Sequence, residues 1–250
     1  MTAESAGGGG EPFLPWQQYE KPARTRQPLS REAIVSAAMK IVDEQGFAAL
    51  SMRAVAQALG TGPASLYAHV QNKEQLVDLL LDRVYGEFET PKPDPARWRE
   101  QTKEYARSGL RALLAHPGLA AASLAGPPMG PNGLRLMETG LGLIRAAGLP
   151  DSIASRAGEL FGQYIAVTAM EQESNQERFG KVGPEQVAEW ISQFRGYLES
   201  LPEDQFPTIV ALARSGALML PATEEERFEL GLDILIRGLA SLAEDRLGNQ

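Results

Sequence analysis

The sequence predicts an all-α protein, in which a small N-terminal three-helix domain precedes a larger helical domain. Apolar residues recur at the three- and four-residue spacing of helices, and no alternating strand pattern lies between them. Capping residues precede several of these segments, and a glycine-flanked turn separates two of the shortest. Helices are predicted near 30–45, 52–59, 63–70, 74–88, 96–115, 132–147, 151–177, 184–200, 205–217 and 224–246.

The first predicted helix begins after Ser30, whose side chain can cap the helix N-terminus, and ends at Gly46. Ser51 can cap the second helix in the same way. The Gly-Thr-Gly sequence at 60–62 then allows a tight turn, and Pro63 suits the first position of the next helix. Two helices joined in this way form a helix-turn-helix, whose second helix lies in the major groove of DNA.

The helix after this turn has an apolar side, formed by Leu66 and Val70, and a side with polar or amphipathic groups. Ser65, Tyr67 and His69 stand on that second side, where side chains can reach base edges. Alternatively, Tyr67 is a half-buried packing residue and His69 is a surface histidine without a partner.

Asn72 can cap a fourth helix, and Gln75 is placed to complete a capping box. This helix is predicted over 74–88, before the proline-rich segment at 91–95, and is expected to link the two domains. The predicted organisation is a flexible basic arm at 1–29, a helix-turn-helix domain at 30–73 and a larger helical domain at 74–250.

Several stretches resemble the TetR family of bacterial repressors. In the N-terminal part these are LSREAIVSAAMKIVDEQGFAALSMR at 29–53 and LYAHVQNKEQL at 66–76. In the C-terminal part they are PPMGPNGLRLMETGLGLIRAA at 127–147, GQYIAVTAMEQE at 162–173 and ERFELGLDILIRGL at 226–239. The C-terminal stretches are similar to the branch typified by the tetracycline repressor. The resemblance implies a homodimer whose domain at 74–250 binds an effector and mediates dimerisation.

The resemblance also implies roles for single residues. The positions of Ser65 and Tyr67 face bases or the DNA backbone, that of Arg53 reaches a base edge, and that of Lys73 grips a phosphate. The helix N-terminus beside Lys73 has free N–H groups and a positive dipole end, which suits a phosphate. Alternatively, Arg53 is only solvated. The first turn of the recognition helix has few hydrogen-bonding groups, so the operator sequence cannot be copied from a relative.

Charge is distributed unevenly along the chain. Residues 21–73 contain seven Lys and Arg against three Asp and Glu, although the whole chain has a net charge of −8. A basic head on an acidic body would turn the head toward phosphate. Lys21, Arg24 and Arg26 precede the first helix and can enter a minor groove as an arm, or belong to an idle tail.

Two late helices have patterns typical of helix–helix contacts. Leucines fall at the a and d spacing of a coiled-coil seam at Leu232, Leu235, Leu239 and Leu242. Small residues recur at every fourth position at Ala154, Gly158, Gly162 and Ala166, where another helix could approach closely. Both patterns could serve packing within one chain. The resemblance favours a four-helix interface between two subunits.

The second domain also supplies candidates for an effector pocket, although any one of these residues is more often part of a core. The apolar and amphipathic candidates are Met129, Met137, Phe161, Tyr164, Trp190 and Phe194. The polar candidates are Asn132, Glu138, Gln163 and Thr168.

Other functional classes lack support in the sequence. The chain has no cysteine and two histidines far apart, so no metal motif is present and no cofactor is expected. No nucleophile elbow, phosphate loop or dinucleotide fingerprint indicates an enzyme. No membrane-spanning run is present, and a cytoplasmic protein is expected. The sequence predicts a repressor released from a palindromic double-stranded DNA operator by a small amphipathic or hydrophobic ligand. The alternatives are an effector-independent DNA-binding regulator and a ligand-responsive activator.

Overall fold

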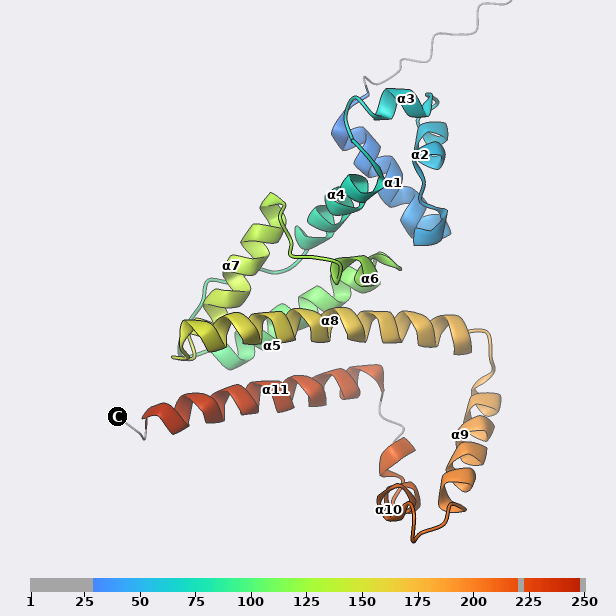
Figure 1. The fold of residues 1–250 in the computed structure, drawn as a ribbon, viewed down its shortest axis with the longest axis vertical. Coiled ribbons are helices and arrows are strands. Elements are labelled where there is room, and N and C mark those ends of the chain that lie inside the picture. Colours follow the sequence, from blue (N-terminus) through green and yellow to red (C-terminus); the bar gives the residue numbers. More distant parts are fainter. Residues whose placement is uncertain (1–28, 220–222, 248–250) are drawn as a thin grey trace, which may run out of the picture.

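The computed structural model describes residues 29–219 and 223–247 and has no strand in these two ranges, so the predicted all-α fold is confirmed. A head at one end of the molecule contains the helix-turn-helix (Figure 1). Its elements are α1 (Arg31–Gln45), the short 3-10 helix η2 (Phe47–Ala49), α2 (Met52–Ala58) and α3 (Pro63–Leu66).

The helix α4 (Lys73–Tyr85) leads from the head into a larger body, where α8 and α11 run side by side (Figure 1). The body contains α5 (Trp98–Leu114), α6 (Leu119–Ser123), α7 (Pro131–Arg145), α8 (Asp151–Phe179) and α11 (Glu224–Leu247). An arm leaves the end of α8 and consists of α9 (Pro184–Glu199), α10 (Pro207–Arg214) and the 3-10 helix η3 (Ala217–Met219).

Side-chain caps determine where the helices of the head begin. Ser30 and Ser51 each accept a hydrogen bond, of 3.1 Å, from the backbone N–H three residues further on. Asn72 accepts one of 2.7 Å from the N–H of Gln75. The Gln75 side chain accepts the N–H of Gln71 rather than that of Asn72, so the predicted capping box closes one residue earlier. These bonds satisfy N–H groups that have no partner within the helix.

The recognition helix is shorter than the sequence pattern predicts. Its α-helical part ends at Leu66, whose carbonyl accepts hydrogen bonds of 2.9 Å from the N–H groups of both His69 and Val70. No side chain caps the start of this helix at Gly62. Tyr67 and His69 were predicted to lie on the helix, but they lie in the turn that follows it.

The apolar core is continuous from the head into the body. Ile34 of α1 and Leu66 of α3 are fully buried in the head, and Leu232 of α11 is fully buried in the body. Leu80 and Val84 of α4 belong to the same core cluster and are also fully buried. The helix α4 therefore packs with both parts, so that a displacement of α4 affects both.

Candidate DNA-binding surface and ligand cavity

The head presents an exposed face formed by α2, α3 and the start of α4. Arg53, Ser65 and Lys73 are all exposed there. The Lys73 ammonium also lies 5.4 Å from the centre of the Phe47 ring. Tyr67 is 52% exposed, which leaves its role as a DNA contact a prediction.

His69 is less accessible than these residues. It is partly buried, and its backbone carbonyl accepts a hydrogen bond of 3.3 Å from the Arg31 guanidinium, which ties the turn to α1. The three cationic residues that we predicted for the N-terminal arm, Lys21, Arg24 and Arg26, lie outside the described residues.

A cavity of about 620 Å³ lies among the end of α4, α5, α7 and α8 and the segment before α7. This volume falls within the range of small-molecule sites, roughly 300–1,000 Å³. Three of the predicted pocket residues line it: Met137, Phe161 and Gln163.

An aromatic wall of this cavity was not predicted. The rings of Tyr85, Phe88 and Tyr105 meet edge to face, with centroids 6.0 and 6.1 Å apart in successive pairs. Burial raises the pKa of Tyr85 to about 12 and also raises that of Tyr105, so both phenols stay neutral and can donate hydrogen bonds. The Tyr105 hydroxyl donates to the Leu136 carbonyl at 3.1 Å. Within the described residues the Tyr85 hydroxyl has no protein partner, and a ligand could provide one.

The opposite wall is formed by small residues that we had predicted at a subunit interface. Gly158, Gly162 and Ala166 of α8 line the cavity, whereas Ala154 is buried in the core. A Cβ atom added to Gly162 would meet no other atom within 4 Å. At Gly162 the missing side chain therefore leaves open space within the subunit, and the close approach of a helix from a second subunit to this stripe stays a prediction.

Seven predicted pocket residues do not line the cavity. Met129 is 73% exposed in the segment before α7, and Glu138 is exposed on α7. Trp190 and Phe194 lie on the arm, where their rings stack with centroids 5.5 Å apart. The remaining three, Asn132, Tyr164 and Thr168, are engaged in helix–helix or local hydrogen bonds.

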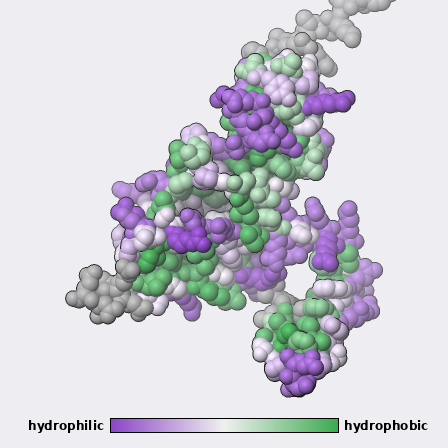
Figure 2. Space-filling view, in the orientation of Figure 1, coloured by the Kyte–Doolittle hydropathy of each residue, from purple (hydrophilic) through white to green (hydrophobic). Residues whose placement is uncertain are grey.

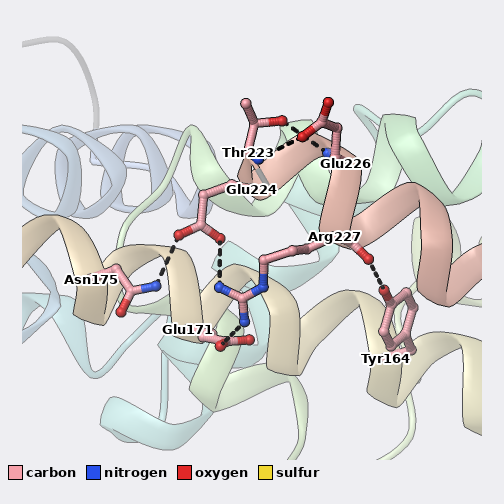
Figure 3. Close-up of polar contacts among 7 residues, drawn as sticks. All are labelled: Tyr164, Glu171, Asn175, Thr223, Glu224, Glu226 and Arg227. Carbon is pink, nitrogen blue, oxygen red and sulfur yellow. Dashed lines mark hydrogen bonds and ion pairs between the residues drawn. The ribbon is translucent and has the colours of Figure 1, made fainter. Parts of the chain in front are cut away.

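The hydrogen bonds of these three residues explain their absence from the cavity. Asn132 donates its amide to the Asp82 carbonyl at 3.0 Å. Tyr164 donates its hydroxyl to the Phe228 carbonyl at 3.0 Å and also lies 3.4 Å from the Arg227 carbonyl, the contact drawn in Figure 3, so that it joins α8 to α11. Thr168 donates to the Tyr164 carbonyl at 2.8 Å. Each polar group is thus satisfied by the chain itself, and a ligand-binding role for these three positions stays a prediction.

Comparison with known proteins agrees with this architecture. The sequence-family model described as bacterial regulatory proteins, tetR family, matches residues 34–80. The sequence-family model described as tetracyclin repressor-like, C-terminal domain, matches residues 90–243. The HTH-type transcriptional repressor DrrR1 of Streptomyces coeruleorubidus is 32% identical over 237 residues, which cover 94% of this chain and 86% of that protein. The chain belongs to the TetR family.

Similar TetR-family structures have been solved. Apo ActR from Streptomyces coelicolor is 43% identical, with a TM-score of 0.77, and the match covers 88% of this chain and 99% of that chain. ActR has also been solved in complex with actinorhodin and in complex with (S)-DNPA. The tetracycline repressor protein class C of Escherichia coli is 25% identical over 217 residues, 86% of this chain and 92% of that protein. TetR-family regulators are DNA-binding transcription factors rather than enzymes, and they form dimers.

The leucines that we predicted at a TetR-family subunit seam belong largely to the core of their own chain. Leu232 is fully buried, Leu239 is 8% exposed, and Leu235 packs against the same core. Leu242 is 46% exposed. Leu232 and Leu239 therefore face the subunit's own interior, and a subunit seam along α11 stays a prediction.

Other apolar side chains of α8 and α11 face outward. Figure 2 shows hydrophobic surface on the body as well as on the end of the arm. On α8 the exposed residues are Leu160, Val167 and Met170, and on α11 Leu230 and Ile234 are more than 60% exposed. Because these side chains are large and apolar, this surface, which we call the outer α8/α11 face, is suited to association.

A histidine between two carboxylates joins the head to the body. His116 lies in the turn after α5, with Nδ1 2.7 Å from an oxygen of Asp43 on α1 and Nε2 3.1 Å from an oxygen of Glu87 after α4. Burial would lower the pKa of His116, but the two carboxylates outweigh it and raise this pKa above its usual value. The sequence did not predict this contact, because neither carboxylate is near His116 in the chain.

The parts of the chain that the structure describes offer neither a metal site nor a membrane span. No group of three or more His, Cys, Asp or Glu side chains there could hold a metal ion. No described helix has both the length and the apolar composition needed to cross a membrane.

Proposed function

We propose that this TetR-family regulator represses transcription from a palindromic operator and is released from it by a flat hydrophobic ligand that enters the cavity. The observation that carries the proposal is the course of α4. This helix begins with Lys73 on the exposed face of the head and ends with Tyr85 in the aromatic wall of the cavity. A ligand that displaces the cavity end of α4 thereby alters the position of the head without touching DNA.

The lining of the cavity indicates the class of ligand. Aromatic rings stand on the side of α4 and α5, and Gly158, Gly162 and Ala166 leave a smooth wall on α8, so that a flat ring system fits between them. Glu159 is the charged member of the described lining, and it is paired with Arg156. A ligand of low charge is therefore favoured, held by apolar burial and oriented by a few hydrogen bonds. The complex of the similar protein ActR with actinorhodin supports this class.

A palindromic operator requires two recognition helices whose spacing matches about 34 Å, or one turn of DNA. We place the subunit contact on the outer α8/α11 face, where exposed apolar side chains of two helices per subunit can form a four-helix interface. In this assignment the exposed Leu230 and Ile234 of α11 form the subunit contact, in place of the buried Leu232 and Leu239.

The proposal can be tested with purified protein and an operator obtained by selection from random DNA. Actinorhodin and a panel of flat polycyclic compounds are screened by thermal shift, because a ligand of the native state raises its melting temperature. A compound that binds should release the operator in an anisotropy titration. Reciprocity requires saturating operator to weaken ligand binding by the same factor.

The substitution Gly162→Phe tests whether the ligand binds in this cavity. The added ring would enter the open space at Gly162 and should lower ligand affinity by more than tenfold, since it occupies the volume of a ligand ring. Gly196→Phe is the matched control, because Gly196 also lies on a helix with no atom near an added Cβ but is outside the cavity. Equal ligand affinity with and without operator would contradict the proposal. Transcription that rises when the operator is occupied would support activation instead.

A further inference from the structure

Two neighbouring residues of α4 bond in opposite directions, one toward the head and the other toward the body. The Arg83 guanidinium donates to the Ser36 hydroxyl at 2.8 Å and lies 3.3 Å from the Glu32 carboxylate, both on α1. The Asp82 carboxylate instead accepts two backbone N–H groups of α7, those of Asn132 and Gly133, each at 2.9 Å. The Asn132 amide returns a bond of 3.0 Å to the Asp82 carbonyl.

The bonds of Asp82 substitute for a missing helix cap. The helix α7 starts after Gly130, which has no side chain to accept its first N–H groups. A carboxylate suits this position because the helix N-terminus has unpaired donors and a positive dipole end. Gly130 also leaves space for this carboxylate, since an added Cβ would overlap the Asp82 side chain. The start of α7 is thus held by α4 and not by its own preceding residue.

The helix α7 is also a wall of the cavity. Leu136, Met137 and Gly140 line the cavity from α7, and Pro128 lines it from the preceding segment. Pro128 packs directly against α7, because a Cβ added to Gly133 would lie 2.6 Å from the Pro128 Cβ. A ligand that pushes this wall therefore pushes the turn of α7 that Asp82 holds.

We propose that Asp82 is the positioning residue through which a displacement of the cavity wall reaches α4 and, through it, the head. The inference rests on the proposed function and assigns its transmission to one side chain. Apolar contacts between α4 and α7 can slide past one another, whereas two hydrogen bonds to one carboxylate fix both direction and distance. Arg83 then passes the movement of α4 to α1.

The separation of the two heads in the dimer provides a readout that needs neither the natural ligand nor the operator. The chain has no cysteine, so Gln57→Cys, at an exposed position of α2, accepts one spin label per subunit. Double electron–electron resonance then gives the distribution of distances between heads. Gly162→Phe serves as a built-in occupant of the cavity and should shift this distance by about 2–4 Å, since helix shifts of about 1–2 Å in each subunit add.

Asp82→Ala should abolish that shift and widen the distribution, because the start of α7 is no longer bonded to α4. The matched control is Asp78→Ala, which removes an exposed carboxylate one turn earlier on the same helix and should retain the shift. Asp82→Asn keeps an oxygen acceptor without the charge and should retain part of the shift. It also covers the case in which the alanine variant fails to fold.

The possible results separate this inference from the function on which it rests. An equal shift caused by Gly162→Phe with and without Asp82 would overturn the role of Asp82 and leave the ligand-release proposal intact. An unchanged distance in the presence of Asp82, together with a distribution widened by Asp82→Ala, would overturn release by cavity occupation while Asp82 still holds the head. A distribution that Asp82→Ala leaves unchanged in width overturns the inference in either case.

Discussion

Raising the pH should weaken the contact between head and body at His116. Both imidazole nitrogens lie within hydrogen-bond distance of a carboxylate oxygen, of Asp43 at 2.7 Å and of Glu87 at 3.1 Å. A neutral imidazole has one N–H, so it can donate to only one of them, and its other nitrogen then faces an acceptor. Both contacts are therefore favourable only for the charged ring.

The expected magnitude follows from the exposure of the three side chains. A buried hydrogen bond to a charged group contributes about 1.5–3 kcal/mol. The His116 side chain is 12% exposed, but those of Asp43 and Glu87 are 39% and 44% exposed, and solvent weakens both contacts. We expect about 1–2 kcal/mol for the pair together. For a chain of 250 residues, this corresponds to roughly 2–8 °C in melting temperature.

The direction of the pH dependence is set by the raised pKa of the folded state. The stabilisation is fully present below the unfolded pKa of about 6.5, and it is lost as the pH rises through the higher folded value. Wild type should exceed His116→Gln in melting temperature most at pH 6, and the difference should shrink toward pH 9. Calorimetry at several pH values measures this difference, and His69→Gln controls for loss of the other histidine. Parallel melting curves for wild type and His116→Gln across this range would refute the reasoning.

Three other predictions concern DNA and assembly. Lys73→Ala should weaken binding to all DNA sequences alike and reduce the salt slope by about one unit, since one fewer phosphate is neutralised; anisotropy titrations at several salt concentrations measure the slope. Replacing Leu230 and Ile234 with glutamate should give a folded monomer that no longer binds a palindromic operator. Circular dichroism measures its helical content and light scattering its mass, and a folded dimer would mean that these side chains lie outside the subunit interface. Deleting residues 1–28 should leave the dimer folded and lower operator affinity, whereas an unchanged dissociation constant at physiological salt would indicate an idle tail.

The elements of the head could be predicted because their signals are local. Ser30, Ser51 and Asn72 cap their helices through groups three residues away, so sequence spacing alone specifies the bond. The end of α3 was less accessible to such reasoning. The Leu66 carbonyl accepts hydrogen bonds from the N–H groups of His69 and Val70, and the helix ends there. The residue types at these positions do not predict this early end.

The cavity could be predicted only in part, because apolar periodicity identifies the apolar face of a helix but not the element that packs against that face. Tyr85 stands four residues after the buried Leu81, the same step that separates the core residues Leu80 and Val84, and only the crossing of α5 and α7 leaves space beside it. Likewise, the glycines of α8 indicate that side chains are absent. Whether another helix or a void takes that space depends on the distances between helices, which the sequence does not contain.

The same limit applies to the subunit interface. Leu232 and Leu239 have the spacing of a coiled-coil seam, and they do form a packed seam, but within their own chain. A partner subunit can then reach only the neighbouring positions of α11, such as Leu230 and Ile234. The pattern indicated correctly that α11 packs along its length. It could not distinguish the subunit's own core from a second subunit, because both present apolar surfaces.

The dimensions of α4 determine how small a change at the cavity can suffice. Its 13 residues at about 1.5 Å each make a rod of about 20 Å, which runs from Lys73 at the DNA-binding face to Tyr85 at the cavity. A displacement of about 2 Å at one end of such a rod tilts it by about 6°. Asp82 and Arg83 both lie in its last turn, next to the cavity, where the displacement would be largest. If the proposed mechanism holds, a ligand needs to move the start of α7 by only a fraction of a side chain. The spacing of the two heads should then change, because the tilt would occur in both subunits.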